Sequence, residues 1–126
     1  MQLSMWSKAN LMIYQGDDYG AIVTVADGVT PAAEIIAGYT AQAQIRSGIA
    51  DEQTTVAAEI ACTVVLPNQI SLSLTHGQTA ALGEQWYQWD LQLVSAGNIV
   101  TTILRGKANL GYEITRETAP ALVAVV

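Results

Sequence analysis

Apolar and polar side chains alternate one by one along most of this chain, and this period of two restricts what it can fold into. From Tyr87 to Leu93 every second residue is apolar, and residues 40–46 and 69–74 repeat the pattern. Successive side chains of an extended strand point to opposite faces, so each run predicts a strand with one buried face. The predicted strands are 10–15, 19–26, 40–46, 55–66, 69–75, 85–95, 98–105 and 107–115.

Strands of this kind predict an all-β fold. Two sheets packed face to face would bury the apolar sides of both, so we expect an antiparallel β-sandwich of about seven or eight strands. A closed barrel is the alternative. Two segments interrupt the rhythm. Residues 27–39 contain turn residues and the apolar pair Ile35 and Ile36, and residues 75–83 predict a polar cap and a short helical turn.

Two residues on apolar strand faces have a predicted structural role. Gly106 interrupts the apolar face near the end of the chain, where a glycine often marks a bulge or bend. Cys62 shares the apolar face of residues 55–66 and is expected to behave as a small core residue. It is the only cysteine, so an intrachain disulfide is excluded.

The length and the surface chemistry favour one domain with few charges. The 126 residues fit a single domain. Only 13% of them are charged, against about 25% in typical soluble domains, which suits both a packed assembly part and an ordinary β-protein. We expect an N-terminal arm at 1–9, a β-sandwich domain at 10–116 and an apolar tail at 117–126. That tail is expected to dock on its own domain or on a neighbouring subunit.

Charge and hydropathy argue against nucleic acid and membrane as partners. The net charge is −6 and the five Lys and Arg residues are scattered, so a phosphate-neutralising patch is not expected. No run of about 18 apolar residues is present to span a bilayer. The N-terminus lacks the basic start and apolar stretch of a signal peptide, so we expect a protein made in a cytoplasm and not secreted.

Three polar residues invite a catalytic interpretation that their surroundings do not support. Asp17 and Asp18 follow Gly16, but a metal pair needs further convergent carboxylates, so a turn with hydrogen-bonded acids is favoured. His76 has no second metal-ligating residue close by and is expected to be a solvated loop residue. The sequence therefore predicts no catalytic, cofactor-binding or metal-binding residue, and a protein that is not an enzyme.

The aromatic cluster EQWYQWD divides by strand parity. Tyr87 and Trp89 share the apolar face and are expected in the core. Trp86 has the opposite parity, which makes it the better candidate for contact with a partner or a glycan.

A series of short motifs resembles a known β-rich module of tailed bacteriophages. The motifs are Gln15-Gly16-Asp17, Ala43-Gln44-Ile45-Arg46, Leu74-Thr75 with Thr79-Ala80, Tyr87 with Trp89-Asp90-Leu91, and Leu104 with Gly106. In this order, over residues 10–116, the chain resembles the N-terminal domain of phage baseplate upper proteins and related tail-fibre and baseplate parts.

The resemblance implies a non-catalytic virion structural protein with an immunoglobulin-like sandwich. Its partners would be other virion proteins and further copies of itself, with a trimer favoured, and its place would be the virion, after synthesis in the host bacterial cytoplasm. The expected assembly contacts are Trp86, Ile35, Ile36, Leu122, Val123, Val125 and Val126.

Two alternatives stay open beside a tail-fibre or baseplate part. One is a capsid cement or decoration protein. The other is a carbohydrate-binding adhesion module that uses Trp86 and the 75–84 loop. Deleting residues 117–126 is expected to weaken assembly more than folding.

Overall fold

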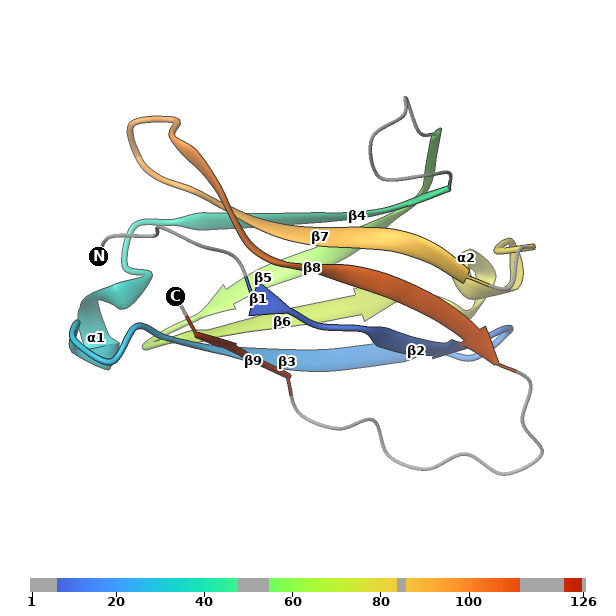
Figure 1. Ribbon diagram of the computed structural model, residues 1–126, viewed down its shortest axis with the longest axis horizontal. Coiled ribbons are helices and arrows are strands. Elements are labelled where there is room, and N and C mark those ends of the chain that lie inside the picture. The colour runs from blue at the N-terminus through green and yellow to red at the C-terminus, as the bar shows by residue number, and fades with distance from the viewer. Residues whose placement is uncertain (1–6, 48–54, 84–85, 112–121, 126) are drawn as a thin grey trace.

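The computed structural model describes residues 7–47, 55–83, 86–111 and 122–125, and its secondary structure is mainly β (Figure 1). The strands are β1 Ser7–Lys8, β2 Leu11–Tyr14, β3 Tyr19–Ala26, β4 Thr40–Ser47, β5 Thr55–Val65, β6 Gln69–Leu74, β7 Trp86–Val94, β8 Val100–Gly111 and β9 Leu122–Val125. The two short helices are α1 Ala32–Ile35 and α2 His76–Ala80. The helical turn predicted in residues 75–83 is confirmed and corresponds to α2.

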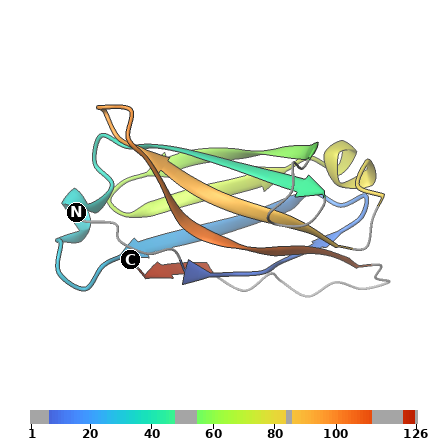
Figure 2. The same ribbon diagram turned by 45° about the horizontal axis from the view of Figure 1, so that its top comes forward.

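The strands form one mixed sheet in the order β1-β8-β7-β4-β5-β6-β3-β9, with β2 also paired to β8. The long strand β5 joins its two halves, because residues 55–60 pair with β4 and residues 61–65 pair with β6. The first half comprises β1, β2, β8, β7 and β4, and the second half comprises β6, β3 and β9. The sheet curls so that the two halves lie over one another (Figures 1 and 2).

The core lies between the two halves and follows the alternation of the sequence. Ile45, Leu91 and Leu104 from the first half and Val23 and Ile70 from the second belong to one buried cluster. The predicted inward faces of β4, β6 and β7 are therefore confirmed. Cys62 is half-buried against the same cluster, and its burial raises the pKa of the thiol to about 11.

The prediction of a wholly antiparallel arrangement is wrong at the two ends of the chain. β1 and β2 run parallel to β8, and β9 runs parallel to β3. Alternation reveals that a segment is extended and which residues face inward, but it carries no information on strand direction. Strand direction follows from short hairpin connections only where such connections exist.

Gly106 does not divide the last part of the sheet into two strands, as the separate predictions for 98–105 and 107–115 imply. β8 is continuous from Val100 to Gly111, and the shift in its pairing with β7 places an additional residue, Ile103, between the partners Thr102 and Leu104. At Gly106 the backbone of Ala9 passes so close that an added Cβ would lie 2.0 Å from its carbonyl oxygen. The glycine therefore admits a neighbouring chain segment.

Part of the apolar tail lies on its own sheet. Residues 122–125 form β9 against β3, and Ala124 is fully buried there. The remainder of the predicted tail, 117–121 and 126, lies outside the described residues.

No helix in the described part of the chain is long and apolar enough to cross a membrane.

Candidate functional site

The Gly16–Asp18 segment forms the turn between β2 and β3, as predicted. Gly16 adopts a positive φ of 88°, and the Asp17 N–H donates to the Tyr14 carbonyl at 3.1 Å. The Asp18 carboxylate accepts from the His76 N–H at 2.7 Å and lies 3.1 Å from His76 Nδ1. The two side chains of this pair are 77% and 74% exposed, so solvent screens the interaction, which fastens the turn to α2.

Thr79 of α2 binds the same turn through hydrogen bonds of its hydroxyl group. Its side chain is fully buried, and its Oγ1 accepts from the Gly16 N–H at 3.0 Å. The hydroxyl can donate its proton to the Asp17 carbonyl at 2.8 Å. Gln15 Nε2 adds a bond to the Leu82 carbonyl at 3.0 Å. These contacts give the polar residues of the segment structural roles, and no metal-binding group of three or more acids, His or Cys occurs among the described residues.

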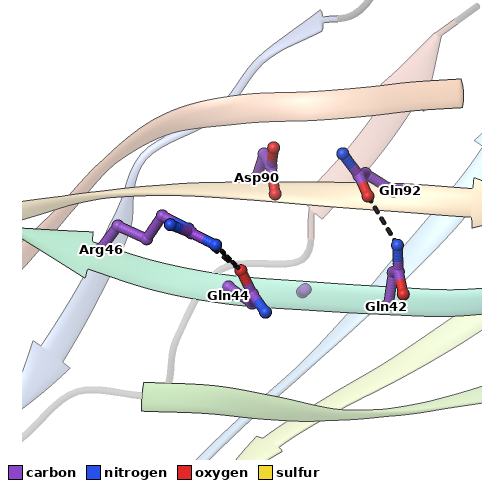
Figure 3. A pocket seen from close by; sticks show the side chains of 6 residues that line it. Gln42, Gln44, Arg46, Asp90 and Gln92 are labelled. Atoms are coloured by element: carbon purple, nitrogen blue, oxygen red, sulfur yellow. Dashed lines mark hydrogen bonds between the residues drawn. The ribbon is translucent and has the colours of Figure 1, made fainter. Parts of the chain in front are cut away.

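A polar groove lies elsewhere, on the outer face of the first half of the sheet (Figure 3). Its volume is about 310 Å³, and it runs along β4 and β7. Its lining residues are Gln42, Ala43, Gln44, Arg46, Asp90 and Gln92. The strand register sets Gln42 opposite Gln92 and Gln44 opposite Asp90, so polar side chains of two strands meet in facing pairs.

Hydrogen bonds between these side chains order most of the groove. Gln42 Nε2 donates to Gln92 Oε1 at 2.7 Å. Arg46 donates twice to Gln44 Oε1, from Nε at 3.0 Å and from Nη2 at 2.8 Å. Gln44 Nε2 in turn donates to Glu59 Oε1 at 2.8 Å. The amides of Gln42 and Gln44 are therefore engaged in hydrogen bonds with neighbouring side chains.

Asp90 differs from its neighbours in the groove. Figure 3 shows its carboxylate between the Arg46 side chain and the Gln92 amide, and no hydrogen bond to that carboxylate occurs within the described ranges. The side chain is half-buried, and this burial raises the pKa of Asp90, while the charges of Arg105 and Arg46 act in the opposite direction. The groove thus contains a partly desolvated acceptor.

The outer face of the second half differs from the groove because its described strands carry no charged side chain, and we call it the uncharged face. β3, β6 and residues 61–65 of β5 contain no Asp, Glu, Lys or Arg. The outward residues of these strands are Gly20, Ile22, Thr24, Ala26, Ala61, Thr63, Val65, Gln69, Ser71 and Ser73. Ile22 is 50% exposed and Val65 is 44% exposed. One curled sheet therefore presents a polar outer face and an uncharged one.

The residues predicted as assembly contacts are distributed over different parts of the molecule. Ile35 and Ile36, which were expected to make assembly contacts, are buried in the core of the chain itself, so their side chains are not available on its surface. Trp86 is the first residue of β7 and pairs in register with Asn109, but its side chain is outside the description.

The C-terminal candidates lie at the edge of the second half. Leu122, Val123 and Val125 belong to β9, where only their backbone is described. Val126 lies outside the described residues. The role of these four residues as assembly contacts therefore stays a prediction.

The core assignment of the aromatic pair is confirmed. Tyr87 is buried, and Trp89 is only 3% exposed. Trp89 Nε1 donates to the Ala9 carbonyl at 2.8 Å, so the indole also holds the N-terminal segment against the sheet.

Neither outer face could be recognised as a candidate site from the sequence. The alternating Gln42, Gln44, Asp90 and Gln92 were visible as polar strand positions. Only the pairing of β4 with β7 shows that they converge. Comparison of the chain with protein-family models and with curated proteins gives no match in either case.

Proposed function

We propose that this protein is a non-catalytic structural subunit of a bacteriophage particle, part of a tail fibre or baseplate, that works through protein–protein contacts. The motifs over residues 10–116 support the phage assignment. The observation that carries the contact function is the uncharged face. The proposal includes an immunoglobulin-like sandwich, with the two halves of the curled sheet as its layers.

The uncharged face suits contact with another protein for a physical reason. The chain has a net charge of −6, so two copies repel each other over most approaches. On the uncharged face no ionised group would lose its water on contact, which removes the largest desolvation cost. Ile22 and Val65 supply apolar area, and the serine, threonine and alanine side chains around them allow close approach.

The proposed assembly is a homo-oligomer, with a trimer favoured, that joins other virion proteins. The protein would be made in the host bacterial cytoplasm and retained in the virion. A capsid cement or decoration protein would use the same uncharged face and is the alternative within this proposal.

Two exposed isoleucines allow a matched test of the contact surface. Ile22 lies on the uncharged face, and Ile99, at 67% exposure, lies in the connection between β7 and β8. We expect the wild-type chain to form oligomers in size-exclusion chromatography with light scattering. Ile22→Lys should reduce the oligomer mass, because it places a charge in the contact, and Ile99→Lys should leave it unchanged. A monomeric wild-type chain, or equal behaviour of the two variants, would contradict the contact proposal.

The particle assignment has its own test. Mass spectrometry of purified phage particles should detect the protein, and antibody labelling in electron microscopy should locate it at the tail or the baseplate. Labelling of the capsid shell would favour the cement alternative. Absence from intact particles would refute the assignment to a virion.

A further inference from the structure

We propose that the polar groove is a binding site for a neutral sugar, held by Asp90, Gln92 and Gln42. This site lies on the other outer face of the sheet from the proposed assembly contact and does not depend on it. It also differs in place from the 75–84 loop, where the side chains of Thr75, His76, Gln78 and Thr79 make hydrogen bonds within the chain. Gln78 Nε2, for example, donates to the Glu59 carbonyl at 3.0 Å.

The unused hydrogen-bonding groups of the groove match the hydroxyls of a sugar. The Gln42–Gln92 bond uses one N–H of Gln42 and the side-chain oxygen of Gln92. An amide has two N–H donors and one carbonyl oxygen, so Gln92 Nε2 remains a donor and Gln42 Oε1 an acceptor. The Asp90 carboxylate is an acceptor only, when ionised. A sugar hydroxyl can donate to Asp90 while its neighbour on the ring accepts from Gln92.

The spacing and the size of the groove agree with this ligand class. Asp90 and Gln92 are two residues apart on β7, so they stand on one face about 7 Å apart along the strand. The volume of about 310 Å³ is close to the lower end of the range for small-molecule sites, roughly 300–1,000 Å³. One or two sugar rings suit such a groove better than a large ligand does.

The charges around Asp90 favour a neutral ligand. An anion would meet the Asp90 carboxylate at the centre of the groove, and a cation would meet the positive charges of Arg46 and Arg105 that act on Asp90. A hydroxyl group avoids both penalties. It also supplies the hydrogen bond that the half-buried carboxylate lacks among the described residues, and a bond to an ionised acceptor is stronger than one between neutral groups.

Binding can be measured by NMR on the full-length chain labelled with ¹⁵N. The probes are maltose, cellobiose, lactose and a mannose disaccharide, each titrated to high millimolar concentration. We expect shifts confined to the backbone of β4 and β7 and to the side-chain amides of Gln42 and Gln92. Shifts confined to another surface, or none with any probe, would overturn the proposal.

Variants separate a sugar site from a merely polar face. Asp90→Asn keeps the shape but removes the charged acceptor, and Gln92→Ala removes the remaining amide donor. Each variant should raise the dissociation constant for the sugar about tenfold or more. Asp90→Asn loses a hydrogen bond to a charged acceptor, and Gln92→Ala loses the hydrogen bond from the amide donor. The control Ser71→Ala lies on the uncharged face and should leave the affinity unchanged. An unchanged affinity in Asp90→Asn would refute the assigned role of the carboxylate. Because the readout is sugar affinity, this outcome is independent of the oligomer mass.

Discussion

Gly106→Ala is expected to disturb the attachment of the N-terminal segment more than any other single added methyl group among the described glycines. The new Cβ would lie 2.0 Å from the Ala9 carbonyl oxygen and 2.8 Å from Asn10 Oδ1. Backbone and side-chain atoms do not approach a Cβ within 3.0 Å, so the segment carrying Ala9 must move by about 1 Å. Its position depends on bonds that tolerate little movement.

Three hydrogen bonds meet at this point. Trp89 Nε1 donates to the Ala9 carbonyl at 2.8 Å, the Ala9 N–H donates to the Arg105 carbonyl at 3.0 Å, and the Lys107 N–H donates to Asn10 Oδ1 at 3.0 Å. Each bond contributes a net of about 1 kcal/mol to stability. Loss of all three predicts that Gly106→Ala lowers the free energy of unfolding by about 3 kcal/mol, before any cost of exposing Trp89.

Urea unfolding followed by tryptophan fluorescence measures this loss. Gly20→Ala is the matched control, because Gly20 also lies in a strand but an added Cβ there meets only the Leu72 carbonyl oxygen, at an ordinary 3.9 Å. Replacing a strand glycine without a clash should stabilise by roughly 0.5–1 kcal/mol through lower chain entropy in the unfolded state. Equal unfolding free energies for the two variants would show that the N-terminal segment does not lie over Gly106.

Four further perturbations follow from the contacts. Trp89→Ala should cost roughly 3–5 kcal/mol in urea unfolding, because it empties a core position that is 3% exposed, and a loss below about 1 kcal/mol would contradict its place in the core. Thr79→Val should cost about 1–2 kcal/mol, because the turn loses the hydrogen bonds of the Thr79 hydroxyl to the Gly16 N–H and the Asp17 carbonyl. Thr63→Val on the exposed face should cost little. Asp90→Asn should raise the unfolding free energy at pH 7 by less than about 1 kcal/mol, because burial raises the pKa of Asp90 and the folded state therefore disfavours the charge. That gain should vanish as the pH falls through the raised pKa towards the ordinary value, and a loss of stability would instead mean that its attraction to nearby arginines dominates. Deleting residues 122–126 should lower the melting temperature of the isolated chain, since β9 pairs with β3, a strand that carries buried core residues. An unchanged melting temperature together with a smaller oligomer would instead support the expectation that the tail acts mainly in assembly.

The alternation of the sequence predicts the strands because it records which side of each strand is buried. β3, β4 and β6 lie within a residue or two of their predicted bounds. The continuity of β8 could not be predicted, because a glycine in an apolar face has the same appearance at a strand break and at a close approach. The glycine at position 106 is needed because the backbone of Ala9, almost one hundred residues away in the sequence, passes close to it.

The sites were less predictable than the strands for a related reason. A groove between β4 and β7 depends on register, which places Gln44 opposite Asp90, and alternation within one strand carries no information on its partner's register. The turn at Gly16–Asp18 was predictable, because its chemistry is local. The burial of Ile35 and Ile36 was not predictable, since their neighbours in the core come from elements distant in sequence.

The two outer faces of the sheet differ in charge, although the chain as a whole carries few charged residues. The outward residues of β3, β6 and the end of β5 are all uncharged, whereas Arg46, Asp90 and Glu59 lie on or beside the polar groove. β5 passes between the halves, so one strand carries Glu59 at its polar end and Thr63 at its uncharged end. In the proposed assembly, a protein partner bound to the uncharged face would leave the groove open, because the two surfaces lie on different halves of the curled sheet. Ile22→Lys and Asp90→Asn should accordingly act independently. The double variant should have the oligomer mass of Ile22→Lys and the sugar affinity of Asp90→Asn, as expected for distant sites that share no partner.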